Sequence, residues 1–409
     1  TSALRRLHSH LAMRLLPALL LTLPALAFAQ GQLTPPADAF LGGVPKTSMR
    51  SLDQLEPRIP LGAVGTNAGM LTIVQPGSYV LMGNVAVTAG DGITITADDV
   101  TLDLNGFTIS SSISPASGTA VRILGEHQNI VVRNGHIRGS LKVDLSDASM
   151  SGGGFQNGVY CYQAALNCLV TDLTVNGVSS HGIYLDGGST IDRCVVSNCG
   201  GKGIVGQVVS NSSATACGER GIVGTTVGNS QGTAVISFGI EASTAINCTG
   251  QTTAVDSGVG LKADLATNCS GFSPAGIGLW AIRGATNCYG TTNSGSCGLK
   301  VGTEGTPQIL GSAENCQGRT GGDGIGLLAG TATDCTGTSG SGFGLQADTA
   351  TGCTGATTSG QRGLYIIGTA TNCRGKNPAT GGVALSATIA VACTAESGSI
   401  LVINRYNMP

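Results

Sequence analysis

The sequence contains few charged and few aromatic residues. Charged side chains make up 11% of the 409 residues and aromatic side chains 4%, with a single tryptophan. The formal net charge is −2, so the chain lacks the basic surplus that favours nucleic acid or an anionic membrane surface as a partner. Hydrophobic residues are nevertheless 41% of the chain, which excludes a disordered protein. A folded chain with so few large side chains is expected to have a narrow core.

Several short motifs that mark binding and catalytic sites are also missing. The sequence has no P-loop and no G-x-G-x-x-G that opens a helix with an acidic partner, so a nucleotide-binding fold is not indicated. It has no Cys-x2-Cys pair and only five histidines, which gives no basis for a zinc site. We therefore predict no metal site and no cofactor from these patterns.

Glycine, by contrast, is abundant, and much of it belongs to an internal repeat. The chain has 65 glycines, more than twice the usual share. Eight cysteines recur at intervals of 18 to 28 residues, each with an alanine three positions before it; they are Cys248, Cys269, Cys288, Cys316, Cys335, Cys353, Cys373 and Cys393. A second motif, Gly-x-Gly-Leu, recurs between these cysteines, as in GIGLLA and GFGLQA. These paired segments are too short for helices and are typical of strands.

A repeat of about 20 residues built from short strands predicts a parallel β-helix, in which each unit forms one coil. Coils stack at about 4.8 Å, so equivalent residues lie above one another and the cysteines form a column. We predict an all-β, right-handed parallel β-helix of about 16 coils between residues 71 and 402.

The cysteines are interpreted as small core residues. A chain with 14 cysteines that is exported invites disulfides, but the parallel Cβ vectors of stacked strands suit that bond poorly. We place Cys217, with Ala214 before it, in the same column. The pair Cys194 and Cys199 is the expected exception.

Residues 1–29 are predicted to be a signal peptide, with translation starting at Met13. Arg14 is the positive end, residues 15–26 are apolar, and Ala27-Phe28-Ala29 is an A-x-A-like cleavage site. An uncleaved membrane anchor is the alternative, although the apolar run is short for a span. We expect an exported protein without a membrane span in its mature chain.

The rest of the chain divides into three parts. Residues 30–60 are predicted to be a leader with a short capping helix over 48–60, in which Ser51 is the N-cap. Residues 61–403 are predicted to be the β-helix, with a looped-out insertion at 140–156 and Cys/Ala/Gly-rich repeats at 210–395. Residues 404–409 are expected to form a C-terminal tail.

Four segments resemble a family of uncharacterised, exported bacterial proteins with right-handed parallel β-helix repeats. They are IVQPGSYVL, GITITADDVTLDLNGFTI, NIVVRNGHIRG and the terminal YNMP. The wider superfamily is pectate-lyase-like, so the resemblance implies acidic polysaccharides as a substrate class, with Ca²⁺ as a cofactor if the chain is a lyase. It implies no catalytic residue that can be transferred to this sequence.

A column of polar residues is the best candidate site. When the coils are aligned on the glycine that begins one strand, the preceding residues on successive coils are Asn157, His181, Lys202 and Arg220. A basic residue in such a column can act as the base of a lyase if its pKa is lowered. The candidate catalytic residues are therefore His181, Lys202 and Arg220.

Aromatic residues occupy outward strand positions shortly after the column residues. An aromatic ring beside a basic row can stack on a sugar, and the row can pair with a uronate or a sulfate. The candidate ligand-binding residues are Asn157, Tyr160, Tyr184 and Asp186. The alternative interpretation is a solvated corner with a few exposed tyrosines.

Two functions remain open at this stage. The first is an exported β-helix that interacts with extracellular polysaccharide, with lyase or hydrolase activity as an extension; the second is a non-catalytic structural or adhesive rod. The best cluster of acids, Asp98, Asp99 and Asp103, is interpreted as a turn and an outward strand residue. A groove beside Tyr184, walled by the insertion at 140–156, would favour a ligand, whereas a flat surface would favour the rod. The oligomeric state is not predicted.

Overall fold

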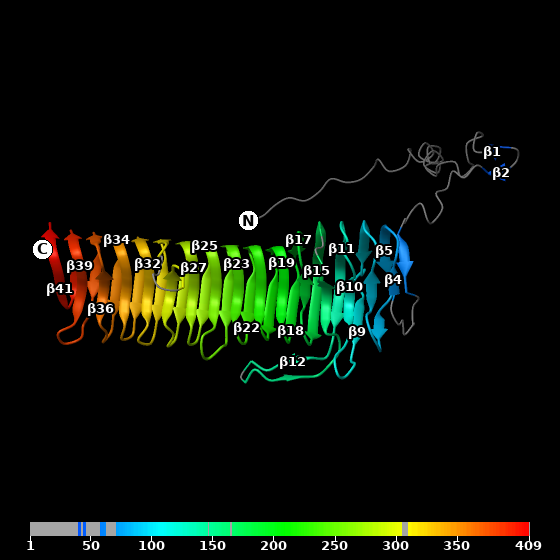
Figure 1. Cartoon of the computed structure of the whole chain (residues 1–409), viewed down its shortest axis with the longest axis horizontal. Helices are drawn as coiled ribbons and strands as arrows, with labels where there is room; N and C mark the ends of the chain where they lie inside the picture. Colours follow the sequence, from blue (N-terminus) through cyan, green and yellow to red (C-terminus); the bar gives the residue numbers. More distant parts are fainter. Residues whose placement is uncertain are drawn as a thin grey trace, which may run out of the picture. The chain divides into compact units, whose positions relative to one another are not determined.

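The computed structural model describes residues 58–62, 71–145, 147–163, 166–304 and 310–408, together with two short strands near residue 40. Those two, β1 (Phe40–Leu41) and β2 (Val44–Pro45), pair antiparallel and belong to a separate unit that ends at Pro57. The second unit begins at Arg58 and is an all-β parallel solenoid of about 16 turns (Figure 1). The predicted all-β parallel solenoid, the coil length of about 20 residues and the number of coils are therefore confirmed.

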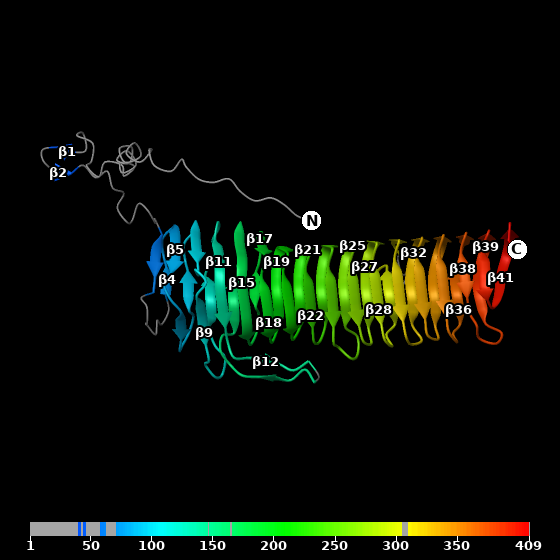
Figure 2. The same cartoon turned by 180° about the vertical axis from the view of Figure 1, so that it is seen from behind.

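Each turn of the solenoid contributes to three parallel sheets, here called A, B and C, which run side by side along its length (Figures 1 and 2). Strands in sheet A alone are β4 (Leu71–Ile73), β7 (Ile93–Ile95), β10 (Thr119–Ile123), β14 (Asn157–Cys161), β16 (Ile183–Leu185), β29 (Cys297–Val301) and β36 (Arg362–Ile366). Strands in sheet B alone are β3 (Ile59–Leu61), β5 (Gly77–Leu81), β8 (Val100–Asp103), β17 (Ser189–Asp192), β30 (Ser312–Glu314) and β37 (Thr369–Thr371).

Longer strands continue from one sheet into the next. Those that run from A into B are β19 (Lys202–Ser210), β21 (Arg220–Gly228), β23 (Phe238–Ile246), β25 (Val259–Thr267), β27 (Ile277–Thr286), β32 (Ile325–Thr333), β34 (Phe343–Thr351), β39 (Val383–Val391) and β41 (Ser399–Tyr406). Those that run from B into C are β11 (Val131–Arg138) and β15 (Cys168–Val178).

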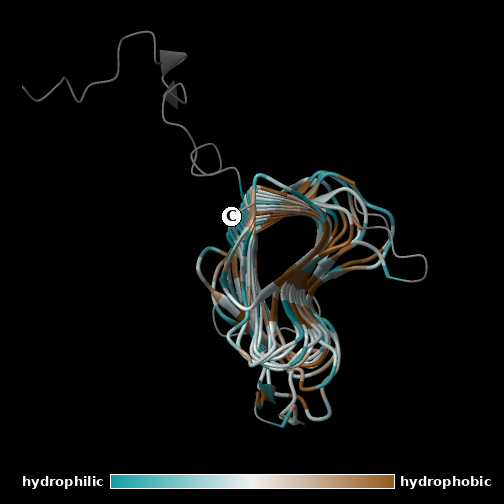
Figure 3. Cartoon of the chain, turned by 90° about the vertical axis from the view of Figure 1, so that its left-hand side faces the viewer, coloured by the Kyte–Doolittle hydropathy of each residue, from teal (hydrophilic) through white to brown (hydrophobic). Residues whose placement is uncertain are grey.

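Sheet C is completed by short strands, one per turn. They are β6 (Val85–Val87), β9 (Thr108–Ser111), β18 (Val195–Cys199), β20 (Ser213–Cys217), β22 (Gln231–Ala234), β24 (Thr249–Thr252), β26 (Ser270–Ser273), β28 (Tyr289–Thr292), β31 (Gln317–Thr320), β33 (Thr336–Ser339), β35 (Thr354–Thr357), β38 (Arg374–Lys376) and β40 (Thr394–Ser397). Figure 3 looks along the solenoid and shows these turns superposed around one interior.

The interior is built from columns of equivalent residues, as the repeat predicts. In sheet A every turn places one aliphatic residue inward, from Ile93 through Ile222 to Leu385, and all three are fully buried. In sheet C the corresponding column changes from valine to glycine along the chain, because Val196 pairs with Ala214 and Ala214 with Gly232. The cross-section therefore narrows towards the C-terminal end.

Glycine is required in the narrow turns because the backbones of sheets A and C approach each other. A Cβ atom added to Gly271 in sheet C would lie 2.1 Å from the carbonyl oxygen of Gly278 in sheet A. The same arrangement recurs at Gly337, whose added Cβ would lie 2.2 Å from the carbonyl oxygen of Gly344. The Gly-x-Gly-Leu line is thus a packing signal, since no side chain fits between the two strands.

Sheets B and C are joined by a one-residue corner in the left-handed conformation. Asparagine dominates there because its short polar side chain tolerates positive φ; Asn247 and Asn268 have φ values of 55° and 52°. Their side chains form a ladder in which each Nδ2 donates to the Oδ1 of the preceding turn, at 3.1 Å from Asn268 to Asn247. The ladder members are Asn211, Asn229, Asn247, Asn268 and Asn287.

The residue after this corner forms the cysteine column, with one correction to the prediction. Cys194 begins the column and is followed by Ser212 and Ser230, since the Cys194 N–H donates to Ser212 Oγ and the Ser212 N–H to Ser230 Oγ. Cys217 is not a member: it ends β20 and lies beside Cys199, with the two Sγ atoms 3.2 Å apart. The Ala-x-x-Cys spacing misled because it occurs in two columns.

All 14 cysteines lie in the described part of the chain, where each is a buried free thiol. The expected exception, a pair between Cys194 and Cys199, is not formed. Burial raises the pKa of the Cys194 thiol and of the Cys297 thiol to about 12. These thiols are therefore protonated, inert core residues at neutral pH.

Two further expectations concern the insertion and the N-terminal segment. Residues 140–145 and 147–152 leave the solenoid around a hairpin of β12 (Lys142–Val143) and β13 (Met150–Ser151), and Phe155 returns to the core. The predicted signal peptide and residues 46–57 of the predicted leader and capping helix lie outside the described residues. At its C-terminal end the prediction of a helix over 48–60 is wrong, because Ile59–Leu61 is strand β3, paired with β5.

Across the described residues, no helix has the length and apolar character needed to span a bilayer. The last strand, β41, pairs with β39 along its length and ends at Tyr406. The last rung therefore continues to Tyr406, past residue 403, where the β-helix was expected to end.

Candidate functional site

The predicted polar column lies at the leading edge of sheet A. The Asn157 Oδ1 accepts a hydrogen bond from the His181 N–H at 3.2 Å, and His181 Nδ1 accepts one from the Lys202 N–H at 3.2 Å. Lys202 pairs in register with Arg220. The four residues therefore lie on successive turns in the predicted order, and side-chain hydrogen bonds connect the first three.

His181 is a neutral imidazole in this setting. Burial, followed by the nearby charge of Lys202, lowers its pKa. Since Nδ1 already accepts the Lys202 N–H, the ring proton is on Nε2. The basic lone pair of His181 is thus occupied, and its Nε2–H is a hydrogen-bond donor.

Four rings gather on the outer face of sheet A, and we call them the aromatic platform. They are Tyr160, Tyr162, His181 and Tyr184. The centroid of Tyr160 lies 6.5 Å from Tyr162, 6.3 Å from His181 and 5.4 Å from Tyr184. The rings of His181 and Tyr184 are 5.1 Å apart. The register of β14 with β16 sets Tyr160 beside Tyr184. Tyr162 follows the end of β14 and His181 precedes β16, so their ring contacts come from the ends of these strands.

Lys202 completes the platform on the next turn. Its Nζ lies 6.0 Å from the Tyr184 ring centroid, a distance at which the ammonium ion is attracted to the ring face. Burial raises the pKa of Tyr184, and the carboxylate of Asp186 adds to that effect. Burial likewise raises the pKa of Tyr160. Both phenols are therefore neutral donors at neutral pH.

Arg220 is held in an ion pair. Its Nη1 lies 2.7 Å from Glu241 Oε2, and its guanidinium stacks on Phe238 at 5.3 Å. Lys262 Nζ lies 3.7 Å from the other oxygen of Glu241. The positive charge of Arg220 is thus offset within the sheet, whereas Lys202 has no ion-pair partner in the part of the chain that is described.

The insertion does not wall a groove beside Tyr184. A hollow of about 510 Å³ follows the platform where β16 ends, and Asp186, Gln207 and Thr225 line it. The insertion instead covers part of sheet C, where a cleft of about 560 Å³ is lined by Arg138 and Lys142. The two features lie on different sheets, so the groove expected from the sequence is replaced by two separate hollows.

The acids of the TADDVTLDLNG line all have structural partners. Asp98 bonds to His127 at 2.9 Å, and Asp99 occupies a left-handed turn. Asp103 is buried and bonds to Arg58 and Arg133 at 3.3 and 3.2 Å. Among the described residues, no group of three or more histidine, cysteine or acidic side chains is placed to hold a metal ion.

The comparisons with known proteins give no relative. No protein-family model matches the chain, and neither a curated protein nor a solved structure matches it. The solenoid fold is therefore shown by the strand pairing alone, and the resemblance to exported bacterial β-helix proteins stays an expectation.

Two functional features were missed at the sequence level. Tyr162 belongs to the platform, and the Tyr-x-Tyr spacing at the end of β14 was the signal that it lies near Tyr160. Arg138 and Lys142 were missed because nothing in the sequence says which sheet a looped-out insertion will cover.

Proposed function

We propose that the protein binds an acidic polysaccharide on the outer face of sheet A. The observation that supports this most is the aromatic platform, in which four rings have neighbouring centroids 5.1 to 6.5 Å apart beside the ammonium ion of Lys202. The apolar C–H face of a pyranose ring packs on such rings. A carboxylate or sulfate on the same sugar pairs with Lys202.

Binding accounts for more of this geometry than cleavage does. A lyase base needs a free lone pair, and the Nδ1 of His181 is already a hydrogen-bond acceptor. Hydrolysis needs two carboxyl groups at a set separation, and Asp186 is the one acid in the candidate set. Lyase or hydrolase activity is kept as the weaker extension of the proposal, with His181 and Lys202 as its residues and Ca²⁺ as its cofactor.

The test is retention of the full chain on immobilised polyuronides and sulfated glycans, with and without Ca²⁺. We expect Tyr184→Ala to weaken retention by about tenfold, the loss of one buried ring contact. Tyr289→Ala is the matched control, because Tyr289 is a partly exposed tyrosine on sheet C, outside the platform. The proposal fails if no glycan is retained, or if the two variants behave alike.

The same incubation tests the enzymatic extension. Absorbance of unsaturated products reports a lyase, and new reducing ends report a hydrolase. Turnover that is lost in His181→Ala and in Lys202→Ala, with an unchanged melting temperature, supports catalysis on this column. Turnover that persists in both variants contradicts it.

A structural or adhesive rod is the second candidate function. It is favoured by the outer face of sheet B after Phe238, where small side chains stack, as at Thr331 and Thr349, whose hydroxyls lie 3.4 Å apart. Such a surface offers little chemistry to a ligand. A correctly folded chain that is retained on none of the glycans would favour this function.

We further propose that the chain is exported and that its coils are right-handed, as in the β-helix family that it resembles. The hydrophobic stretch before Ala27-Phe28-Ala29 supports export, and the strong preference of parallel crossovers supports the hand. Expression from Met13 in a bacterial host is expected to yield an extracytoplasmic chain that begins at Gln30. N-terminal sequencing of the cell fractions checks this, and a cytoplasmic, uncleaved chain would contradict it.

A further inference from the structure

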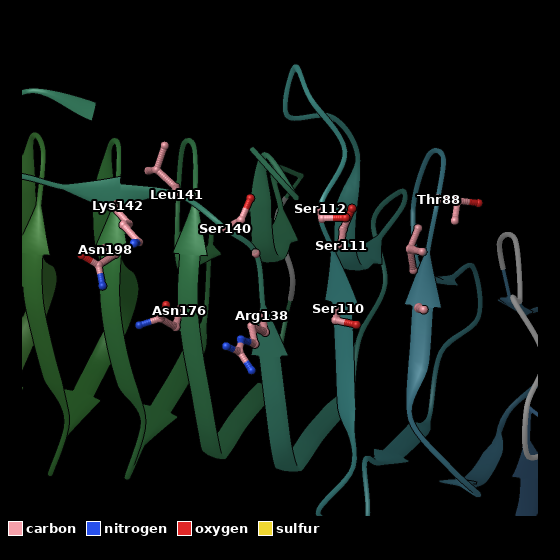
Figure 4. A pocket seen from close by; sticks show the side chains of 13 residues that line it. Thr88, Ser110, Ser111, Ser112, Arg138, Ser140, Leu141, Lys142, Asn176 and Asn198 are labelled. Carbon is pink, nitrogen blue, oxygen red and sulfur yellow. The ribbon is translucent and has the colours of Figure 1, made fainter. Parts of the chain in front are cut away.

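The strongest unassigned feature is the cleft between the insertion and the outer face of sheet C (Figure 4). We call residues 140–152 the strap. The cleft measures about 560 Å³, which is within the range of small-molecule sites. Its polar lining residues include Ser110, Arg138, Ser140, Lys142, Asn176 and Asn198.

The floor of the cleft is a row of outward side chains on neighbouring strands. Arg138 pairs in register with Ser110 on one side and with Asn176 on the other. Figure 4 shows Arg138 between these two residues. The Asn176 Nδ2 donates to Ser197 Oγ at 2.5 Å, so its amide is fixed in place. A cation is thus set between a hydroxyl and an amide, each one strand spacing away.

The roof of the cleft is an anchored segment. Leu141 and Val143 are buried and pack against Val235. The Val143 N–H lies 3.5 Å from Asn198 Oδ1, and the Gly153 N–H donates to Ser140 Oγ at 3.0 Å. Lys142 is exposed between two buried neighbours and lines the cleft. The strap therefore holds Lys142 over the sheet.

The two cations have no anionic partner in the part of the chain that the structure describes. Neither Arg138 nor Lys142 forms an ion pair within the described residues, and no carboxylate lines the cleft. Seven other arginines of the solenoid do lie beside a carboxylate; they are Arg58, Arg122, Arg133, Arg193, Arg220, Arg283 and Arg374. In a chain with so few charges, two unpaired cations at one hollow are a marked departure.

We propose that this cleft binds an acidic sugar, whose carboxylate or sulfate lies between the Arg138 guanidinium and the Lys142 ammonium. A guanidinium pairs with a planar oxyanion through two hydrogen bonds, and an ammonium adds a second charge. The serine hydroxyls and the amides of Asn176 and Asn198 match the hydroxyls of a sugar ring. The site is on sheet C, so it is independent of the aromatic platform on sheet A.

The test is hydrogen exchange of the full chain, read peptide by peptide, with three probes. They are trigalacturonate, its trimethyl ester and a monosulfated disaccharide. We expect the charged probes to slow exchange in the strap and the neutral ester to leave it unchanged. Whether the uronate, the sulfated sugar or both protect the strap identifies the anionic group.

Matched variants separate this site from the platform. Arg138→Ala is expected to weaken binding at the strap by about tenfold or more, since a charge-assisted hydrogen bond is lost. Arg319→Ala is the control, because Arg319 is an exposed, unpaired arginine on the same sheet without a strap above it. Tyr184→Ala is expected to abolish protection at the platform and to preserve it at the strap.

The outcomes decide between the two sites. Strap protection that survives Arg138→Ala, that occurs equally with the ester, or that never occurs overturns the proposal. Protection at the strap without retention through the platform would leave this site standing while the proposed function fails. Because Arg138 has no ion-pair partner to lose, an unchanged melting temperature is expected and confirms that the variant folds.

Discussion

In the turns up to Val227, the inward columns of sheets B and C hold mainly valine and isoleucine, such as Ile191 and Val196. From Ala245 onwards, the same columns hold alanine and glycine, such as Ala266 and Gly271. The longest turn also lies in the first of these two regions. Successive inward residues of sheet A are 38 residues apart from Val121 to Val159, against 28 from Leu299 to Leu327 and 18 from Ile222 to Ile240.

The difference shows what a wide core allows. Side chains that fill the interior keep the sheets apart, so a turn can carry an insertion or a buried acid without closing the coil. The aromatic platform, the strap and the buried Asp103 all lie in the wide half. In the narrow half the backbones of sheets A and C are in contact, so no side chain fits between them, as at Gly271 and Gly278.

The largest loss of stability is expected from a side chain added inside a narrow turn. Gly271→Val should destabilise the fold by more than about 3 kcal/mol, because the new Cβ meets a backbone oxygen that cannot move aside. Val196→Ala, at the corresponding position of the wide half, should cost about 2 kcal/mol through the cavity it leaves. Urea unfolding of both variants measures this. A cost below that of Val196→Ala would mean that the narrow turns can open.

The buried acid gives the next largest effect. Asp103→Ala should cost about 3 kcal/mol, since it removes a buried carboxylate that pairs with two arginines and accepts hydrogen bonds from the Asn105 N–H and the Asn134 amide. The exposed pair of Asp264 and Arg283 in the narrow half is the control, and Asp264→Ala should cost about 0.5 kcal/mol. Equal losses in thermal unfolding would show that the wide half does not depend on its buried charge.

The asparagine ladder crosses both halves and should have a smaller effect. Asn268→Ala should cost about 1 kcal/mol, because alanine disfavours the left-handed corner and the ladder bonds are lost. Asn268→Gly keeps the corner and removes only the ladder, so the difference between the two separates conformation from hydrogen bonding. A glycine variant as unstable as the alanine variant would assign the whole effect to the ladder.

The smallest expected effect is the titration of His181. Its pKa is lowered in the fold by burial and by Lys202, so the unfolded chain binds the proton more readily. Stability is therefore full above about pH 6.5 and falls as the pH drops through the lowered folded value. His181→Asn should flatten the profile of stability between pH 7 and pH 5. A profile that is unchanged in the variant would exclude His181 as its source.

The fold could be predicted from the sequence because residues that recur along the chain occupy equivalent positions on successive turns. Residues that recur every 18 to 20 positions, such as Cys335 and Cys353, do lie on neighbouring turns. Where two columns share a motif, a residue can be assigned to the wrong column, as Cys217 was. The order of Asn157, His181, Lys202 and Arg220 was correct, since it requires only the register of one strand.

The candidate site was less predictable because its chemistry depends on contacts across turns. The ion pair between Arg220 and Glu241 joins residues of adjacent turns, and the aligned columns contained enough information to expect it. The direction of the strap did not follow from the sequence. It is set by Leu141 and Val143, whose burial against Val235 requires knowing which surface lies below the insertion.

The close match between neighbouring turns has a consequence for how such a chain can change in length. The strands β32 and β34 superpose residue for residue from Leu327 on Leu345 to Thr333 on Thr351, one turn of 18 residues apart. Removing or copying one such unit in frame would join surfaces that already fit the same neighbours. We therefore expect the narrow half to fold with one unit more or fewer, while the wide half and its two hollows stay intact.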